Sequence, residues 1–127
     1  MIDYFKSEKV NDAVTAIRSR SGEIMYLVEG QEKAILIDTC VGVKGLKELV
    51  ESLTDKPITV LITHGHIDHA MGAPEFQEVY MNPLDLDVYM EHRKLEGRKG
   101  YIAANIGGFE DWMNEDSNFV PETDLEF

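Results

Sequence analysis

The sequence predicts an α/β protein in which a mixed β-sheet is flanked by helices. Strand-sized apolar runs surround one clear amphipathic helix in the first half of the chain, and the order strand, helix, strand implies a parallel crossover. Residues 58–63 form a short, mostly apolar run, which is typical of a strand covered on both faces in a layered protein.

The strands before the helix are predicted from alternation and turn residues. Residues 13–17 alternate weakly, whereas residues 24–29 and 33–38 are rich in β-branched and apolar side chains. Gly30 and Gln31 lie between the last two runs, so we expect these runs to form a hairpin with a short turn.

A helix is predicted over residues 43–53. Leu46, Leu49, Val50 and Leu53 recur at the spacing of one helical face. Pro57 then interrupts the chain before the strand at 58–63.

The second half gives weaker signals. Residues 78–81 predict a short strand, and Asn82 and Pro83 predict the start of a helix over residues 84–95. Gly97 and Gly100 should end or interrupt that helix. A further short helix is expected near residues 101–106, and the acidic stretch from Glu110 onward is expected to be a solvated loop.

Length and charge exclude several classes of protein. The chain has 127 residues, enough for one domain, and its net charge of −12 disfavours binding to nucleic acid and to anionic membranes. The N-terminus lacks the continuous apolar core of a signal peptide, and the single Cys40 excludes an intrachain disulfide. We therefore expect a reduced, cytoplasmic protein.

The residues 63–69, Thr-His-Gly-His-Ile-Asp-His, carry the strongest functional signal. His64 and His66 are two apart, so in extended chain both would point to one side and could bind one metal. Asp68 and His69 lie further round the turn and could serve a second metal, while Gly65 would let the loop turn sharply. Imidazole and carboxylate donors suit zinc, iron or manganese.

This pattern resembles the His-x-His-x-Asp-His signature of the metallo-β-lactamase superfamily. The preceding segments agree, since one strand ends in Asp38 and a helix and a second strand then lead to the histidine loop. The Ala-Met-Gly-Ala segment at 70–73 also looks like the usual continuation. The resemblance covers residues 13–82 well and the rest poorly.

The resemblance implies a four-layer αβ/βα sandwich, of which this chain would supply half. It implies that His64 and His66 bind a first metal ion, with zinc the leading candidate, that Asp68 and His69 bind a second, and that a metal-bridging hydroxide carries out hydrolysis. Asp68 would act in catalysis by holding or deprotonating that water. Asp38 would orient a ligand histidine or the loop; a turn or helix cap is the equal alternative.

For the other candidate side chains we expect ordinary structural roles. His92, in the predicted helix, is expected to face solvent, and Cys40 is expected to pack as a small, semi-buried apolar residue. A further group of aromatic residues could line a substrate pocket but more commonly forms core or interface: Tyr89, Tyr101, Phe109 and Trp112.

The leading hypothesis is a metal-dependent hydrolase of a small-molecule substrate, present here as the N-terminal part of a single domain. Residues 13–82 would bear the motif, and residues 83–127 would form a helical and acidic connecting segment. The later histidines and bridging aspartate of the superfamily are not found, and the chain ends on Leu125, Glu126 and Phe127 within an apolar/polar alternation. On its own the chain should be inactive or weakly active.

Two alternatives stay open. The first is a non-catalytic half-domain that forms a homodimer or pairs with a missing C-terminal half, because half of a sandwich leaves an apolar sheet face exposed. The second is a relative with a di-iron centre for redox chemistry, which the mixed ligand set permits.

Overall fold

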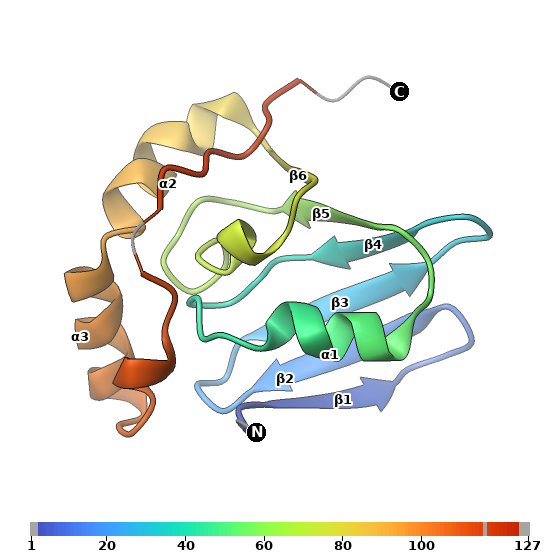
Figure 1. Ribbon diagram of the computed structural model, residues 1–127, viewed down its shortest axis with the longest axis horizontal. Helices are drawn as coiled ribbons and strands as arrows, with labels where there is room; N and C mark the ends of the chain where they lie inside the picture. Colours follow the sequence, from blue (N-terminus) through green and yellow to red (C-terminus); the bar gives the residue numbers. More distant parts are fainter. Residues whose placement is uncertain (1–2, 116, 125–127) are drawn as a thin grey trace.

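The computed structural model describes residues 3–115 and 117–124 (Figure 1). The acidic residue Asp116 and the three terminal residues, on which the expected truncation was based, lie outside the described residues. The strands are β1 (Phe5–Lys9), β2 (Val14–Ser19), β3 (Ile24–Glu29), β4 (Ala34–Ile37), β5 (Ile58–Ile62) and β6 (Val79–Met81). The α-helices are α1 (Leu46–Leu53), α2 (Leu86–His92) and α3 (Leu95–Asn105), and short 3-10 turns are η1 (Ala73–Glu75), η2 (Pro83–Asp85) and η3 (Glu110–Trp112).

The six strands form one mixed sheet in the order β1-β2-β3-β4-β5-β6. β1 to β4 are antiparallel neighbours, whereas β4, β5 and β6 run parallel. The hairpin around Gly30 and the parallel crossover through α1 were both predicted, and both are confirmed. The parallel strands end at the same edge of the sheet, which is where the histidine loop begins.

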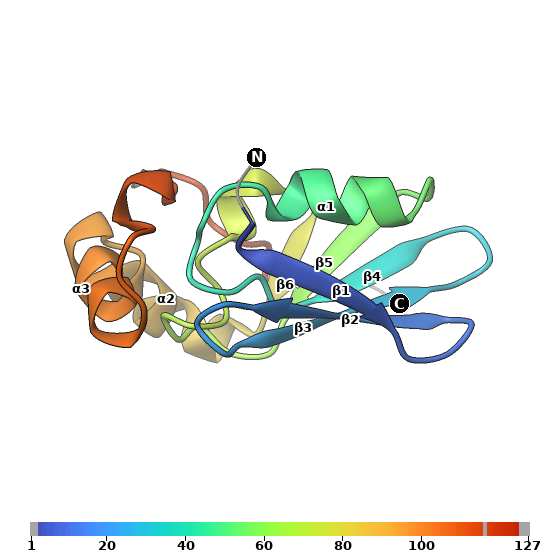
Figure 2. The same ribbon diagram turned by 90° about the horizontal axis from the view of Figure 1, so that it is seen from below.

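One face of the sheet packs against α1 (Figure 2). Leu46 and Val50 of the helix are fully buried, and so are Leu27, Leu36 and Val60 on the strands beneath. Gly45, at φ 106°, lets the chain enter the helix in the left-handed region, and its N–H donates to Glu75 Oε2 at 3.3 Å. The helix therefore begins at Leu46 and not at the expected residue 43.

The opposite face of the sheet is apolar but lies open. Its central row, set by the strand register, is Ala16, Tyr26, Ile37, Leu61 and Tyr80. Tyr26 is 41% exposed, whereas most of the other side chains on this face are half-buried. Figure 2 shows no helix of the described chain on this side of β2 and β3. The expectation that the sheet is covered on both faces is met here on one face only.

β1 was not predicted from the sequence. Its residues Phe-Lys-Ser-Glu-Lys are mostly exposed, because it is an edge strand with one neighbour. Polar side chains suit such an edge, which has to avoid pairing with other chains. At the other edge the chain near Glu122 pairs with β6: Glu122 N donates to Val79 O at 2.8 Å, and Met81 N donates to Glu122 O at 2.9 Å.

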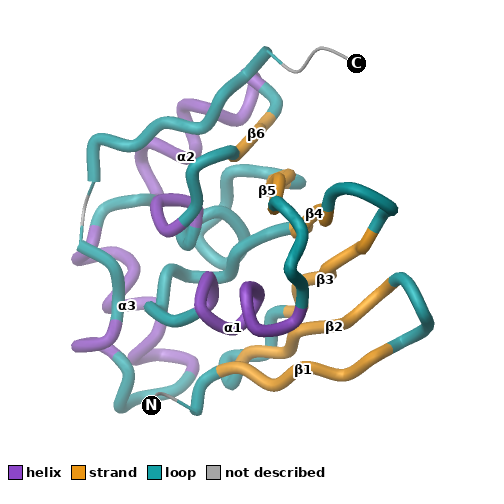
Figure 3. The backbone as a smooth tube through the Cα atoms, turned by 45° about the vertical axis from the view of Figure 1, so that its right-hand side comes forward, coloured by secondary structure: helices purple, strands orange, loops and turns teal. Residues whose placement is uncertain are grey.

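The helices α2 and α3 lie beyond the ends of β4 and β5 (Figures 1 and 3). Asn82 caps the first turn as predicted, because Leu84 N donates to its Oδ1 at 2.9 Å. The expected single helix instead breaks at Lys94, whose ψ of 130° is extended. The prediction that glycines end the helix is wrong: α3 runs through both Gly97 and Gly100.

The packing of α3 explains why these glycines are tolerated. Arg98 and Ile102, on the same helix, are 2% and 0% exposed, while a Cβ at either glycine would meet nothing within 4 Å. Burial of one face therefore outweighs the poor helix propensity of two solvent-facing glycines.

Candidate metal centre

The histidine loop follows β5 directly and is joined to the chain that follows β4. The His69 carbonyl accepts from Thr39 N at 2.7 Å and from Thr39 Oγ1 at 3.1 Å, and Met71 N donates to Cys40 O at 3.0 Å. The sheet edge therefore holds the backbone of the loop at the carboxyl ends of two parallel strands. Polar groups on such loops commonly form the functional site of an α/β protein.

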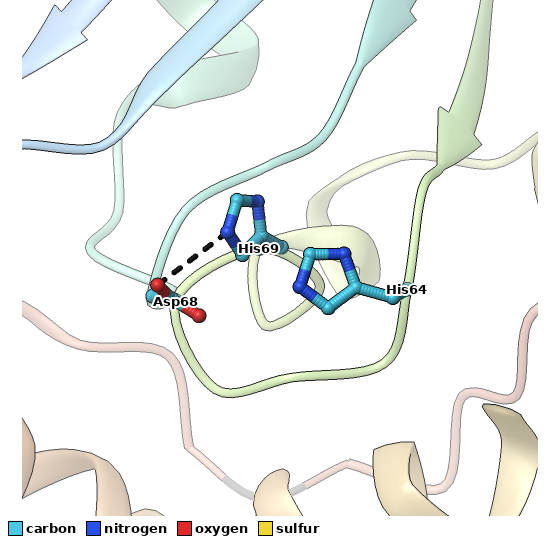
Figure 4. A group of neighbouring side chains, drawn as sticks. All are labelled: His64, Asp68 and His69. Atoms are coloured by element: carbon cyan, nitrogen blue, oxygen red, sulfur yellow. Dashed lines mark ion pairs between the residues drawn. The ribbon is translucent and has the colours of Figure 1, made fainter.

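Three of the four predicted ligands converge in this loop (Figure 4). One donor atom from each of His64, Asp68 and His69 lies within 4.8 Å of the others. Asp68 Oδ2 is 3.4 Å from His69 Nε2, and all three residues are half-buried. The group is thus partly shielded by protein and partly exposed to solvent.

Asp38 organises this group from beneath. It is 6% exposed and accepts from three donor groups of two residues. Thr63 N donates to Oδ1 at 2.8 Å, and His69 Nδ1 lies 3.0 Å from Oδ2. The Thr63 hydroxyl is shared between the two oxygens, with Oγ1 3.0 Å from Oδ1 and 2.8 Å from Oδ2. Its φ of 68° is left-handed, a strained conformation that aspartate tolerates better than most residues. The structure places Asp38 where an orienting residue should lie.

Thr63 extends the same network to the other histidine. Its Oγ1 lies 2.8 Å from His64 Nδ1 and within donating distance of Asp38. The tautomer that satisfies these contacts has His64 Nδ1–H donating to Thr63, whose hydroxyl donates to Asp38. Sequence analysis missed Thr63, because its role depends on a carboxylate 25 residues earlier in the chain.

The donor set fits a divalent cation. His64 and His69 both use Nδ1 for hydrogen bonds, so both leave Nε2 available as a ligand atom. A histidine that ligates through one nitrogen while the other donates to a carboxylate is a common arrangement in metal sites. Two imidazoles and one carboxylate match the borderline preference of zinc.

His66 lies apart from the three grouped ligands. It is exposed, its ring is 4.7 Å from that of His64, and it stacks on His92 with ring centroids 5.5 Å apart and planes at 26°. The structure therefore does not divide the four residues into the two pairs that the spacing suggested.

The expectation that His92 faces solvent as an ordinary helical histidine is wrong. It is half-buried, and its Nδ1 accepts a hydrogen bond from Ile67 N at 3.0 Å. The contact joins residues 25 positions apart, and no local pattern in the sequence marks it.

Gly65 is required by close packing. A Cβ there would lie 2.7 Å from Asp85 O and 2.9 Å from Tyr89 N, so any side chain would strike the backbone leading into α2. The sequence interpretation attributed Gly65 to a sharp turn, but its φ is not in the left-handed region. The loop and α2 are consequently in direct backbone contact.

A buried polar network lies behind the site. Cys40 is fully buried and donates to Glu23 Oε1 at 3.1 Å, and Ser21 Oγ donates to the same oxygen at 2.6 Å. Burial, followed by the Glu23 charge, raises the pKa of the Cys40 thiol. Burial, followed by the charges of Glu23 and Asp68, raises the pKa of Tyr101 to about 12. Both groups therefore stay protonated near neutral pH.

The remaining aromatic residues divide between core and surface. Tyr89 is 1% exposed, and Phe109 packs edge-on against Tyr4 with ring centroids 4.8 Å apart. Trp112 is 49% exposed and lines a groove with Phe5 and Leu49, away from the histidine loop.

The fold and site define an α/β protein with a candidate His/Asp metal centre at the carboxyl ends of parallel strands. The chain belongs to the metallo-beta-lactamase superfamily, whose family model matches residues 24–125. Members of this superfamily bind divalent metals, and the superfamily is one of hydrolases.

Two relatives show how much of a longer protein this chain resembles. A metal-dependent hydrolase of Sulfolobus acidocaldarius is 30% identical over 89 residues, which are 64% of this chain and 38% of that protein. An acyl-coenzyme A thioesterase of Homo sapiens is 25% identical over 95 residues, which are 61% of this chain and 34% of that protein. The matched part of this chain thus spans little more than a third of either relative.

Solved structures agree on the fold. The metallo-beta-lactamase FIM-1 from Pseudomonas aeruginosa, in its mono-zinc form, superposes with a TM-score of 0.57 at 19% identity, covering 70% of this chain and 46% of that one. A metallo-beta-lactamase from Hirschia baltica gives a TM-score of 0.58 at 21% identity, covering 70% and 48%. These similarities confirm the α/β fold class that the sequence predicted.

Within the described part of the chain, no helix has the length and hydropathy needed to cross a membrane.

Proposed function

We propose that this chain forms part of a metal-dependent hydrolase in which His64, Asp68 and His69 hold a divalent cation. The convergence of these three donors above Asp38 carries the proposal. His66, whose ring is 4.7 Å from that of His64, supplies a further imidazole from the exposed side of the loop. Zinc suits this donor set best, and iron or manganese would also be accepted.

A bound divalent ion supplies a water molecule of lowered pKa, and hence a nucleophile near neutral pH. The residues of this chain would orient the histidine rings and the water. Asp38 and Thr63 fix the two histidine rings so that both Nε2 atoms remain available. Asp68, one-third exposed at 34%, has a carboxylate that can hold the attacking water and accept its proton.

The proposed activity belongs to the complete domain. The chain spans about a third of its two relatives, so we propose that the remaining ligands come from sequence outside it. The 127-residue chain should therefore hold metal weakly and hydrolyse slowly, because part of the ligand set would come from that other sequence. The substrate would be a small molecule with an ester, thioester, lactone, amide or phosphodiester bond.

Metal content after purification without chelator tests the ligand assignment. We expect sub-stoichiometric zinc in the chain and its loss in His64→Ala, Asp68→Ala and His69→Ala, with partial loss in His66→Ala. Asp55→Asn is the matched control, because Asp55 is an exposed acid outside the donor group. Unchanged metal in His64→Ala and His69→Ala would refute the assignment.

The rate of hydrolysis should depend on the bound metal. A panel of esters, thioesters and lactones should show a slow rate that chelator removes and added zinc restores, with thioesters included because one relative is a thioesterase. A rate that survives both chelator and Asp68→Ala would rule out this mechanism.

A second candidate function is favoured by the open sheet face. The row centred on Tyr26, Ile37 and Leu61 is apolar and lacks a covering layer among the described residues. We propose that this face pairs with a second copy of the chain or with the rest of a longer domain. A chain that sediments as a stable monomer at all concentrations would contradict pairing with itself.

A further inference from the structure

His92 reaches the histidine loop from a separate element. It is the last residue of α2, and its Nδ1 accepts from Ile67 N at 3.0 Å. The same ring stacks on His66, with centroids 5.5 Å apart and planes at 26°. One side chain therefore contacts two consecutive residues in the middle of the loop.

The hydrogen bond meets a specific need of the loop backbone. The His66 carbonyl accepts from His69 N and from Ala70 N, both at 3.1 Å, so residues 66–70 form a single helical turn. The first N–H groups of such a turn have no partner within it. Ile67 N–H is one of these groups, and His92 accepts it. The histidine acts as a cap that comes from 25 residues away.

The contact is distinct from the support that Asp38 gives. Asp38 fixes His69, the last donor of the loop, directly. It fixes His64, the first donor, through Thr63. His92 fixes the peptide between His66 and Ile67, immediately before Asp68. The two ends and the middle of the loop are thus held by different elements, the end of β4 and the end of α2.

We propose that His92 is a positioning residue that preorganises the metal-binding loop through its Nδ1. The proposal rests on the proposed function, in that the loop must hold a cation. Accepting at Nδ1 leaves the proton of the neutral ring on Nε2. With the Ile67 peptide fixed, Asp68 and His66 need less ordering when a cation binds.

Paired substitutions separate the hydrogen bond from the stacking. His92→Phe keeps an aromatic ring over His66 but removes the acceptor, whereas His92→Asn keeps an acceptor oxygen close to the position of Nδ1 but removes the ring. Asp87→Asn, at an exposed position of the same helix, is the control for substitutions in α2.

The readouts are cobalt affinity by chelator competition, the visible spectrum of bound cobalt and amide exchange at Ile67, all on the 127-residue chain. We expect His92→Phe to weaken cobalt binding about tenfold, to alter the spectrum and to speed exchange at Ile67. His92→Asn and Asp87→Asn should stay close to wild type. Rescue by asparagine is a result that loss of packing alone would not give.

Three results would overturn the proposal. Equal cobalt affinity in His92→Phe and wild type would refute it while leaving the proposed function intact. Equal weakening in both His92 variants would assign the effect to the ring and not to the acceptor. A wild-type chain that binds no cobalt at all would refute the proposed function and this inference together.

Discussion

The two faces of the sheet are built from alternate residues of the same strands, yet their surroundings differ. On β4, Leu36 is fully buried under the layer that contains α1, whereas its neighbour Ile37 is half-buried on the open face. Both are apolar, and the same holds for Val60 and Leu61 on β5. Side-chain chemistry alone therefore does not distinguish the two faces, and the open face is apolar although no helix of the described chain covers it at β2 and β3.

The largest effect should come from truncating each neighbour on β4 in turn. Leu36→Ala should lower the free energy of unfolding by about 3 kcal/mol, because it leaves a cavity in a closed core. Ile37→Ala should cost about 1 kcal/mol, because solvent fills the space beside a half-buried side chain. Urea unfolding at low protein concentration measures both.

Leucine and isoleucine are isomers, so Leu36→Ala and Ile37→Ala remove the same number of carbon atoms. Equal destabilisation by the two substitutions would mean that Ile37 is buried in solution. The open face would then be covered within the monomer, and the contrast between the faces would disappear.

A smaller effect is expected on association. Tyr26→Glu places a charge at the most exposed point of the open row and should weaken self-association at least about tenfold, or about 1.4 kcal/mol. Val10→Glu is the matched control, since Val10 is 59% exposed but lies in the β1–β2 turn, away from that row. Sedimentation across a concentration series measures both, and equal weakening would point to net charge and not to the face.

The smallest expected effect is on the pH dependence of stability, and it involves α2, which covers the ends of the strands and not a face of the sheet. Burial raises the pKa of Tyr89 to about 12, above its usual value of 10. The unfolded chain therefore loses this proton first, so the associated stability is complete below pH 10 and declines as the pH rises toward 12. Tyr89→Phe should show a shallower fall in melting temperature between pH 9 and 11.5. An unchanged slope would place the alkaline sensitivity elsewhere.

The sequence was sufficient where structure is encoded locally. The hairpin around Gly30, the crossover and the cap at Asn82 follow from turn chemistry and short-range periodicity, and the structure has all three. β1 escaped prediction because an exposed edge strand lacks the apolar alternation that marks a strand. A short helix was predicted near residues 101–106, but the first half of α3 was missed, because buried Arg98 and Ile102 stabilise a helix that its glycines disfavour.

In the candidate site, too, the features encoded locally were predicted and the long-range contacts were not. The cluster of His64, Asp68 and His69 was recognisable from spacing and resemblance, and the structure brings these three together. The contacts that hold them come from distant positions. Thr63 depends on the carboxylate of Asp38, and His92 depends on an amide in a loop that precedes its own helix. Such partners become visible only when the strands and helices are placed in space.

The four candidate ligands lie within six consecutive residues, whereas their carboxylate support comes from the end of another strand. Under the proposed ligand assignment, a nascent or unfolded chain would offer these donors to a cation before β4 and β5 have paired, although without Asp38 to orient the rings. A cation that binds the unfolded chain as well as the native one adds less to folding stability than its native affinity alone would give. For this protein, metal supply during synthesis and the thermodynamic gain from metal in the finished fold are separate quantities.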